Sequence, residues 1–174
     1  MCSSDLDGPL TESSPLRPES PYGRTKLALE RCLADVAAAT GLRHATFRYF
    51  NAAGATAACR ERHEPETHLI PNALRAAYGA LPALRLFGTD FPTRDGTCER
   101  DYVHVADLAE AHWRALAHLR AGGPSFTVNL GGGVGHTVRE VIAAVERVTG
   151  RPVPVTAEGR RAGDPARLVA DITA

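Results

Sequence analysis

The sequence has little lysine: Lys26 is the one lysine among its 20 basic residues, so every other fixed cation is an arginine. An excess of charge is also lacking, since Lys plus Arg and Asp plus Glu each total 20 and the formal net charge is +0. Proteins that bind nucleic acid or an anionic membrane through phosphate groups need a basic surplus. We therefore expect no nucleic-acid partner.

Long apolar runs and paired cysteines are lacking as well. No run approaches the roughly 20 apolar residues that a membrane-spanning helix needs, and the N-terminus has no signal-peptide pattern. The four cysteines form no C-x-x-C pair and no zinc-ligand spacing, which is typical of free thiols in a reducing compartment. We therefore expect a cytoplasmic protein with no membrane partner and no metal.

Apolar residues make up 44% of the 174 residues, which is enough for the core of one domain or of part of a larger one. Stretches with strand and helix character alternate along the chain. This alternation predicts an α/β fold rather than a sandwich or a helical bundle. We expect helices at about 22–40, 69–79, 106–120 and 137–150, and strands at 43–50, 84–87, 101–105, 126–130 and 153–156.

Lys26 ends the segment Ser-Pro-Tyr-Gly-Arg-Thr-Lys at 20–26, where the first helix is expected to begin after Pro21. Tyr22 and Lys26 are four residues apart and therefore share a face of the first turn. A phenol has an ordinary pKa near ~10, too high for a base at neutral pH, and a neighbouring ammonium favours the phenolate. The pair is a candidate for proton transfer, although a tyrosine beside a solvated lysine explains the spacing equally well.

Two further motifs have structural explanations that we favour. The segment Gly-Gly-Gly-Val-Gly-His at 131–136 places His136 where a dinucleotide-binding G-x-G-x-x-G needs glycine, so we expect a turn there. The segment His-Glu-Pro-Glu-Thr-His at 63–68 has metal-ligand types, but proline interrupts any helical register, so we expect a solvated loop. His104 and His112 are expected to be hydrogen-bonded partners at strand and helix edges.

Arginine-containing segments at 100–102 (Arg-Asp-Tyr) and 160–164 (Arg-Arg-Ala-Gly-Asp) are candidates for binding a nucleotide diphosphate. The guanidinium fork donates two parallel hydrogen bonds to phosphate, and a nearby aspartate can accept from ribose hydroxyls. Either segment alone is also explained as a pair of surface charges.

The order of these motifs resembles the NAD-dependent epimerase/dehydratase family of extended short-chain dehydrogenases/reductases, from about residue 7 to residue 171. Two of the segments, Arg-Tyr-Phe-Asn and Asp-Gly-Thr…Arg-Asp-Tyr, are specific to the branch that epimerises nucleotide sugars at carbon 4. The segments that carry the resemblance are Ser-Pro-Tyr-Gly-x-x-Lys at 20–26, Arg-Tyr-Phe-Asn-x-Ala-Gly-Ala at 48–55, Leu-Ile-Pro at 69–71, Phe-Gly-Thr-Asp-x-Pro-Thr-x-Asp-Gly-Thr at 87–97, Arg-Asp-Tyr-Val-His-Val-x-Asp-Leu-Ala at 100–109, Asn-Leu-Gly-x-Gly-x-Gly at 129–135 and Arg-Arg-x-Gly-Asp at 160–164.

The resemblance implies the C-terminal part of a doubly wound, Rossmann-type parallel sheet, followed by a small α/β substrate domain. Residues 7–50 would end the NAD-binding domain, and 51–174 would be mostly the nucleotide-sugar domain, interleaved with the last Rossmann elements. The implied activity interconverts UDP-glucose and UDP-galactose through a 4-keto sugar, with tightly bound NAD taking and returning the hydride. The intact enzyme would be a homodimer, joined through the helix that begins at Tyr22.

The same resemblance implies the roles of individual residues. Tyr22 would take the proton from the sugar 4-hydroxyl, and Lys26 would hold the nicotinamide ribose and stabilise the phenolate. Phe50 would lie near the nicotinamide, so that all three contact NAD. The implied substrate-binding residues are Asn51 at the sugar, the backbone of Leu86 and Phe87 at the uracil, Arg100 and Arg161 at the diphosphate, and Asp164 at the uridine ribose.

Two parts of the family pattern are not found in this sequence: the glycine-rich NAD loop and the Ser or Thr of the catalytic triad. Residues 1–6 resemble an assembly scar where that Ser or Thr is expected, so Ser3 and Ser4 are not assigned to the role. We therefore expect the 174 residues alone to be a fragment with little or no turnover. Two alternatives stay open: another nucleotide-sugar epimerase or dehydratase of the family, and a non-catalytic UDP-sugar-binding module.

Overall fold

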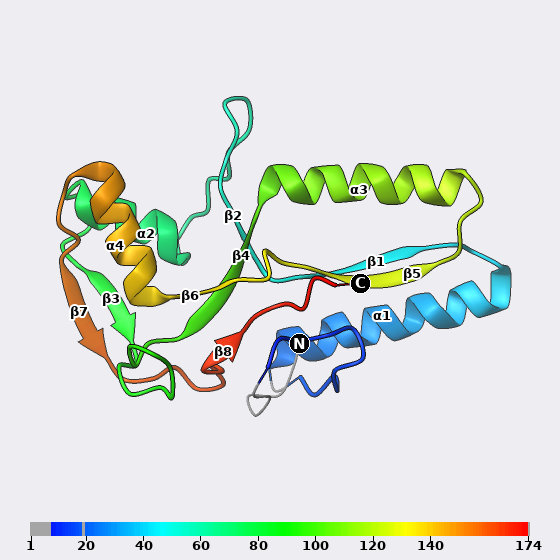
Figure 1. Ribbon diagram of the computed structural model, residues 1–174, viewed down its shortest axis with the longest axis horizontal. Helices are drawn as coiled ribbons and strands as arrows, with labels where there is room; N and C mark the ends of the chain where they lie inside the picture. Colours follow the sequence, from blue (N-terminus) through cyan, green and yellow to red (C-terminus); the bar gives the residue numbers. More distant parts are fainter. Residues whose placement is uncertain (1–7, 19, 174) are drawn as a thin grey trace. The chain divides into compact units, whose positions relative to one another are not determined.

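The computed structural model describes residues 8–18 and 20–173, so the expected scar at 1–6, with Ser3 and Ser4, lies outside the described residues. Helices and strands alternate along the chain, which confirms the predicted α/β class (Figure 1). In chain order they are α1 (Pro21–Thr40), β1 (Ala45–Tyr49), β2 (Asn51–Ala53), α2 (Leu69–Ala77), β3 (Leu84–Phe87), β4 (Glu99–His104), α3 (Val105–Arg120), β5 (Phe126–Leu130), β6 (Gly135–Thr137), α4 (Val138–Thr149), β7 (Val155–Glu158) and β8 (Arg167–Leu168).

The chain divides into two compact units. The first unit contains residues 1–54, 101–134 and 168–174, and the second unit contains residues 55–100 and 135–167. Each unit has its own parallel strand pair, β1 with β5 in the first and β3 with β7 in the second. The chain therefore passes between the units several times, and the boundary near residue 100 falls inside β4.

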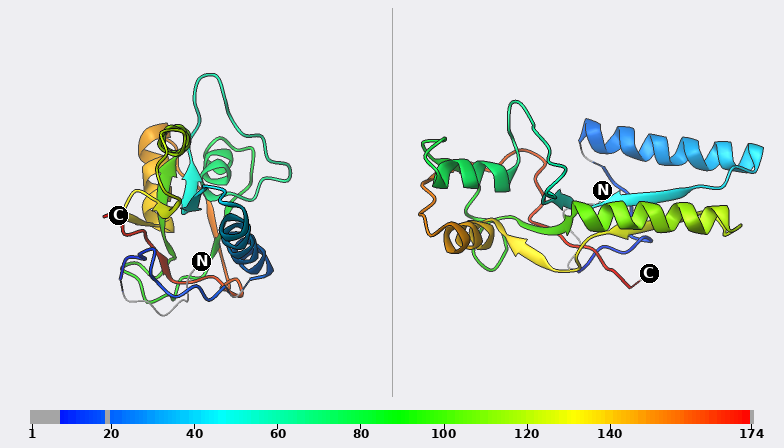
Figure 2. Two further views of the ribbon diagram at one scale, coloured as in Figure 1. Left: turned by 90° about the vertical axis from the view of Figure 1, so that its right-hand side faces the viewer. Right: turned by 90° about the horizontal axis from the view of Figure 1, so that it is seen from above.

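In the first unit, helices cover both faces of the strands. β1 pairs with β5 from Ala45↔Phe126 to Tyr49↔Leu130, and β2 pairs in parallel with β4. Alternate side chains of a strand point to opposite faces. Phe47 accordingly packs edge-on against His112 of α3, whereas the next residue, Arg48, bonds to Glu30 of α1. Figure 2 shows α1 and α3 on opposite sides of β1, the layering of a doubly wound sheet.

The start of α1 is fixed by local chemistry. The Ser20 hydroxyl accepts a hydrogen bond from the Gly23 backbone N–H at 3.0 Å, and Pro21 occupies the first turn, where its missing N–H is not needed. A Cβ at Gly23 would lie 2.9 Å from Cβ of Pro18, so the helix approaches the preceding loop too closely for any larger residue. Gly41, at φ 75°, ends the helix in the left-handed conformation.

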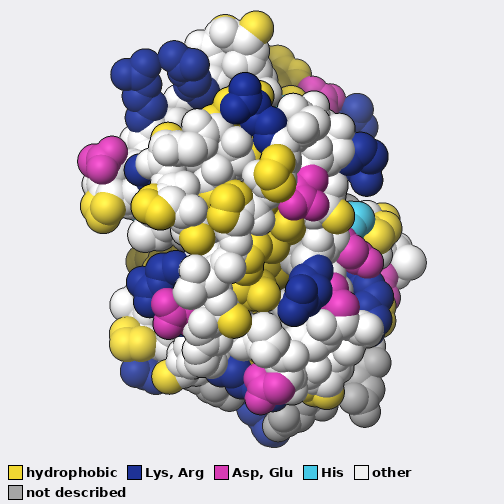
Figure 3. Space-filling model, turned by 90° about the vertical axis from the view of Figure 1, so that its left-hand side faces the viewer, with side chains coloured by type: hydrophobic (Ala, Val, Ile, Leu, Met, Phe, Trp, Pro, Cys, Tyr) yellow, Lys and Arg dark blue, Asp and Glu magenta, His cyan; other side chains and the backbone are white. Residues whose placement is uncertain are grey.

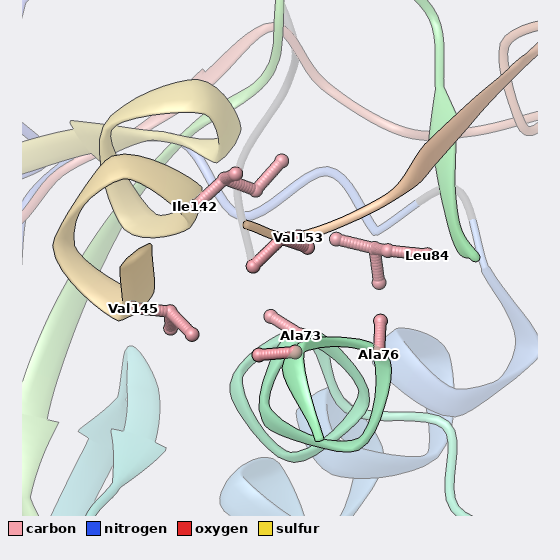
Figure 4. Packing of buried hydrophobic residues seen from close by; sticks show 7 residues of the cluster. Ala73, Ala76, Leu84, Ile142, Val145 and Val153 are labelled. Carbon is pink, nitrogen blue, oxygen red and sulfur yellow. The ribbon is translucent and has the colours of Figure 1, made fainter. Parts of the chain in front are cut away.

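The second unit has an apolar core between α2, α4, β3 and the residues before β7. Small alanines on α2 allow the larger side chains of the other elements to approach closely (Figure 4). The sequence Thr-x-x-Glu at 137–140 is typical of a capping box, and α4 begins with one: Thr137 accepts from the Glu140 backbone N–H, and the Glu140 side chain accepts from the Thr137 N–H. The core residues are Ala73, Ala76, Ala77, Leu84, Ile142, Val145 and Val153.

Apolar side chains also reach the surface of the second unit. Figure 3 looks onto this unit and shows hydrophobic side chains gathered among basic ones. Tyr78 and Val148 are exposed there, and the Arg151 guanidinium carbon lies 4.8 Å from the centre of the Tyr78 ring. Arginine thus covers part of this apolar surface through a cation–π contact.

Two expectations from the sequence are wrong. The last long strand begins at Val155, paired with Leu84, and not at 153, because the Val153 N–H is bound by the Glu146 carboxylate. The polar, Pro-rich sequence at 1–21 predicts a loop with no core-forming period, but Leu10 is buried and bridges Ala170. The short strands β2, β6 and β8 were not expected. All of these features depend on partners distant in sequence.

Candidate active site

Tyr22 and Lys26 lie together on the first turns of α1, as their spacing predicts. The Lys26 Nζ is 5.0 Å from the centre of the Tyr22 ring, and Tyr22 is 62% exposed. An ammonium over an aromatic face is held there by the negative potential of the ring. The two side chains are thus in contact, with the charge of the chain's one lysine over the ring of an exposed phenol.

Phe50 and Asn51 lie where the chain changes strand partners. The Phe50 N–H donates to the Leu130 carbonyl at 3.0 Å, at the end of the β1–β5 ladder. Asn51 then opens β2 and pairs with Tyr102 of β4. In open parallel sheets, ligands bind beyond the carboxyl ends of strands where the chain order changes. Phe50 and Asn51 occupy such a point, in the same unit as Tyr22 and Lys26.

Tyr49, the residue before Phe50, is hydrogen-bonded to His112 of α3. The His112 Nδ1 lies 2.7 Å from the Leu108 carbonyl, which can only accept, so Nδ1 donates. The His112 Nε2 therefore accepts from the Tyr49 hydroxyl, at 2.6 Å. Burial raises the pKa of Tyr49, which keeps that hydroxyl a donor.

His104 likewise has a structural partner. Its Nδ1 accepts from the Ala106 N–H at 3.1 Å and caps α3. The prediction that His104 and His112 are hydrogen-bonded is confirmed, and His104 lies at an element edge as expected, but His112 lies in the middle of α3.

In the second unit, predicted nucleotide-binding residues form one connected group. Leu86 is buried in β3, and Phe87 follows it at the strand's end. The Arg161 guanidinium carbon lies 3.7 Å from the centre of the Phe87 ring. The Asp164 N–H donates to the Arg161 carbonyl at 3.3 Å, which closes the turn that carries both residues.

Arg100 joins this group from β4. Its Nη2 lies 3.7 Å from the Asp164 Oδ1, and its side chain is largely buried. Burial raises the pKa of the nearby Cys98 thiol, so that this side chain stays uncharged beside Arg100. Arg100 thus pairs with Asp164 on the same turn whose Arg161 stacks on Phe87, and these residue types are suited to a nucleoside diphosphate.

The neighbouring Arg160 has a different partner. Its Nε donates to the Asp90 carboxylate at 2.8 Å, and its guanidinium carbon lies 4.3 Å from the centre of the Phe91 ring. The hydrogen bond from Arg160 lowers the pKa of Asp90. Of the two adjacent arginines, Arg160 thus holds the loop before β4, while Arg161 stacks on Phe87.

The glycine run after β5 is a structural turn, as predicted. Gly132 and Gly133 donate their N–H groups to the fully buried Asp101 carboxylate, at 2.6 and 3.0 Å, and Ala170 donates a third at 3.0 Å. A Cβ at Gly131 would lie 2.5 Å from the Asp101 Oδ2, so the turn closes too tightly around the carboxylate for a side chain. Asp101 is therefore a structural acceptor, a role that its place in the Arg-Asp-Tyr motif did not indicate.

The Asp-Gly-Thr segment is structural as well. The Asp95 carboxylate accepts from the N–H and hydroxyl of Thr97, at 2.9 and 2.7 Å, and from the Thr137 hydroxyl at 2.5 Å. Burial opposes the charge of Asp95, but the hydrogen bonds from Thr137 and Thr97 outweigh it and lower the pKa of Asp95. This buried cluster fixes the loop before β4 to the start of α4.

The histidine-containing segment at 63–68 is exposed. His68 Nδ1 bonds to the Glu66 carboxylate at 2.8 Å, and the His63 and His68 rings are in edge contact. Within residues 8–18 and 20–173, no group of three or more metal-ligating side chains comes together. In the same ranges, no helix combines the length and apolar character needed to cross a bilayer.

Comparison with known proteins places this geometry in a family. The model of the NAD dependent epimerase/dehydratase family matches residues 3–131. A UDP-glucose 4-epimerase of Rhizobium leguminosarum bv. trifolii is 52% identical over 165 residues, which are 94% of this chain and 50% of that protein. The chain thus spans about half the length of the curated relatives it matches.

Solved structures agree. A UDP-glucose 4-epimerase from Brucella ovis in complex with NAD has a TM-score of 0.89 at 52% identity, over 94% of this chain and 51% of that one. The enzyme from Bifidobacterium longum, in complex with NAD+ and UDP, has a TM-score of 0.86 at 37% identity, over 94% and 50% of the two chains. This chain belongs to the NAD dependent epimerase/dehydratase family.

Proposed function

We propose that this chain is part of an NAD-dependent UDP-sugar 4-epimerase, an isomerase of carbohydrate metabolism that interconverts UDP-glucose and UDP-galactose. The observation that carries the proposal is the Tyr22–Lys26 pair, with the ammonium 5.0 Å from the ring centre. Family membership and the UDP-glucose 4-epimerases among its relatives support the assignment.

The first unit supplies the residues for proton transfer. Tyr22 takes the proton from the sugar 4-hydroxyl, and the Lys26 ammonium stabilises the resulting negative charge. Lys26 and Phe50 would hold the nicotinamide end of NAD, which would supply reversible hydride transfer at carbon 4 of the sugar. The residues present thus fit the nicotinamide end. A glycine loop for the pyrophosphate is not found among the described residues, because the run at 131–133 is folded around Asp101.

The second unit supplies most of the nucleotide-sugar site. Arg100 and Arg161 bind the diphosphate, and Asp164 accepts from the uridine ribose. The backbone of Leu86 and Phe87 holds the uracil. The burial of Leu86 and the contact of Arg161 with the Phe87 ring support this assignment, because they fix the end of β3 next to Arg161. Asn51, the first residue of β2, contacts the sugar in this proposal.

We also propose that the intact enzyme is a homodimer joined through α1. Leu29 and Val36 are 63% and 48% exposed, and the exposed Cys32 lies between them. These three residues follow the spacing i, i+3, i+7 and so form one stripe along the helix. A second copy of the same stripe would cover it.

The protein works in the cytoplasm in this proposal, with a UDP-sugar as its substrate and neither nucleic acid nor membrane as a partner. The free thiols support a reducing compartment: Cys32 and Cys59 are exposed, and Cys98 is buried. The balanced charge of the sequence supports the small-molecule substrate over a polyanion.

The test uses the full-length protein that contains this chain and follows the conversion of UDP-glucose to UDP-galactose. Tyr22→Phe should lower kcat by about 10²–10⁴-fold, the usual contribution of a general base, with KM little changed. Tyr78→Phe is the matched control, because Tyr78 is similarly exposed but lies in the second unit on α2's end.

Each alternative predicts a different result. A dehydratase or another epimerase of the family would yield a different product from a panel of UDP-sugars, while still depending on Tyr22. A UDP-sugar-binding module would bind UDP without NAD and would be indifferent to Tyr22→Phe. Full kcat in the Tyr22→Phe enzyme would overturn the proton-transfer role.

A further inference from the structure

Arg48 of β1 makes hydrogen bonds in two directions. Its Nε and Nη2 donate to the two carboxylate oxygens of Glu30 on α1, at 3.1 and 2.5 Å, and its Nη1 donates to the Glu12 carbonyl at 2.8 Å. The Arg48 and Glu30 side chains are only 19% and 24% exposed. Hydrogen bonds from Arg48 are the main reason that the pKa of Glu30 is lowered. We call Arg48, Glu30 and Glu12 the Arg48 anchor.

The anchor reaches both strands of the first unit's parallel pair. Glu12 accepts the Asn129 N–H of β5 with its side-chain Oε1, at 2.7 Å, while its carbonyl binds Arg48 of β1. Arg48 and Asn129 are also register partners in the β1–β5 ladder. One guanidinium group, that of Arg48, therefore links α1 to the β1–β5 pair and to the loop that precedes the helix.

Glu30 lies on the same broad face of α1 as the proposed catalytic pair. Tyr22, Lys26 and Glu30 are spaced by four residues, and each such step turns the helix by only about 40°. An α-helix is stiff over two turns, so an anchor at Glu30 fixes the rotation of the first turns. At the other end, the start of α1 packs closely on the preceding loop, since a Cβ at Gly23 would lie 2.9 Å from the Pro18 Cβ.

Arg48 lies on β1, two residues before Phe50, which directly follows the end of that strand. The fork of Arg48 therefore links the helix that carries Tyr22 and Lys26 to the strand that delivers Phe50 and Asn51. A bidentate arginine–carboxylate pair fixes orientation as well as distance, which a single ammonium contact does not.

We infer that Arg48 and Glu30 are positioning residues: they set the rotation of α1 that presents Tyr22 and Lys26 toward the end of β1. This inference rests on the proposed function. A misplacement of about 1 Å can cost about 10²-fold in rate, whereas replacing both members of a partly buried ion pair is often neutral for stability. The signature of positioning is thus a loss of kcat that exceeds any loss of folded protein.

The experiment compares variants of the full-length protein that contains this chain. Arg48→Lys keeps the charge but loses the fork, and Glu30→Gln keeps the shape but loses the charge. The pair Arg48→Met with Glu30→Met removes both charges and leaves no isolated ion. We expect kcat to fall about 10–100-fold in all three, while KM for UDP-glucose changes less than about twofold, because most of the proposed nucleotide contacts lie in the second unit. The double variant should be no slower than the slower single variant.

The matched control is the Arg114–Glu110 pair on α3, an exposed ion pair of the same unit with an Nε–Oε1 distance of 2.7 Å. Arg114→Lys and Glu110→Gln should leave kcat unchanged. Circular dichroism of each variant gives the folded fraction, by which kcat is corrected.

Two failures can be told apart. If Tyr22→Phe abolishes turnover but Arg48→Lys retains full kcat, the positioning role is overturned and the proposed function stands. If Tyr22→Phe retains full kcat, the proposed function fails and the inference fails with it. A loss of kcat that disappears after correction for folded protein would also overturn positioning, since it would make the anchor a stability element only.

Discussion

The two units are stabilised in different ways. In the second unit, seven apolar residues form a cluster, and β3 alternates buried and more exposed positions next to it. In the first unit, no residue of β1 or β5 is fully buried, and the strands are tied to their helices by polar groups such as Arg48 and Tyr49.

The first unit also exposes more of its helices' apolar side chains. Leu29 of α1 and Trp113 of α3 are each more than half exposed. A parallel pair of strands is ordinarily found inside a larger sheet that is covered on both faces. The strands β1 and β5 are thus less covered than β3, which lies beside the second unit's apolar cluster.

The largest difference between the two units should appear in the free energy of unfolding that is lost when an apolar side chain is truncated. Ile142→Ala removes most of a side chain from the second unit's cluster, where it is 8% exposed, and should cost about 2–5 kcal/mol in the free energy of unfolding. Leu116→Ala, on the exposed face of α3, should cost less than about 0.5 kcal/mol. Urea unfolding of the 174-residue chain measures both. Equal losses would show that the second unit's cluster is not the main apolar core.

A smaller effect tests the polar ties of the first unit. Asp101→Asn replaces a fully buried carboxylate that accepts three backbone N–H groups, so one amide nitrogen would face donors. The loss should be about 2–3 kcal/mol. Asp171→Asn is the control, since Asp171 accepts from Thr173 at an exposed position near the C-terminus. A silent Asp101→Asn would mean that the glycine turn holds its shape without the carboxylate.

Local chemistry allowed most of this fold to be predicted. The capping box at Thr137, the helix stop at Gly150 and the strands at 84–87 and 126–130 depend on neighbours in sequence or on continuous apolar runs, and the structure has them at the expected positions. The segment at 131–136 lacks one glycine of the dinucleotide-binding motif, and this difference, visible in the sequence, correctly predicted a structural turn. The Tyr22–Lys26 pair was predictable for the same reason, since four residues along a helix always share a face.

What could not be predicted depends on partners far apart in the chain. The burial of Leu10 requires Ala170, and the role of Asp101 requires the N–H groups of residues 132, 133 and 170. Arg48 was read as part of a family motif, and nothing in its sequence neighbourhood indicates Glu30, 18 residues away. Polar networks of this kind have no period in sequence, unlike apolar faces.

The Tyr49–His112 hydrogen bond between β1 and α3 should contribute less to the free energy of unfolding than the buried Asp101 carboxylate does. Tyr49→Phe removes the hydroxyl that donates to His112 and should cost about 0.5–1.5 kcal/mol in the free energy of unfolding, the usual worth of one hydrogen bond. Tyr78→Phe in the second unit should be neutral, since the Arg151 contact uses only the ring. If both changes were neutral, the first unit would not depend on this polar tie as the comparison proposes.

The smallest effect concerns the pH dependence of the second unit. Hydrogen bonds from Arg94, followed by that from the Thr137 N–H, lower the pKa of Glu140 to about 2. A carboxyl whose pKa is lower in the folded state stabilises the fold above its unfolded pKa of about 4.5, and this contribution is lost as the pH falls toward 2. Because Glu140 is partly exposed, solvent screening limits the contribution to less than about 1 kcal/mol. Glu140→Gln should therefore have a Tm slightly below that of the parent chain at pH 6, with the difference shrinking between pH 4.5 and 2.5. Arg94→Gln should narrow the pH range over which Glu140 affects the Tm. If the Tm difference between Glu140→Gln and the parent chain stayed constant with pH, the effect would belong to the helix cap alone.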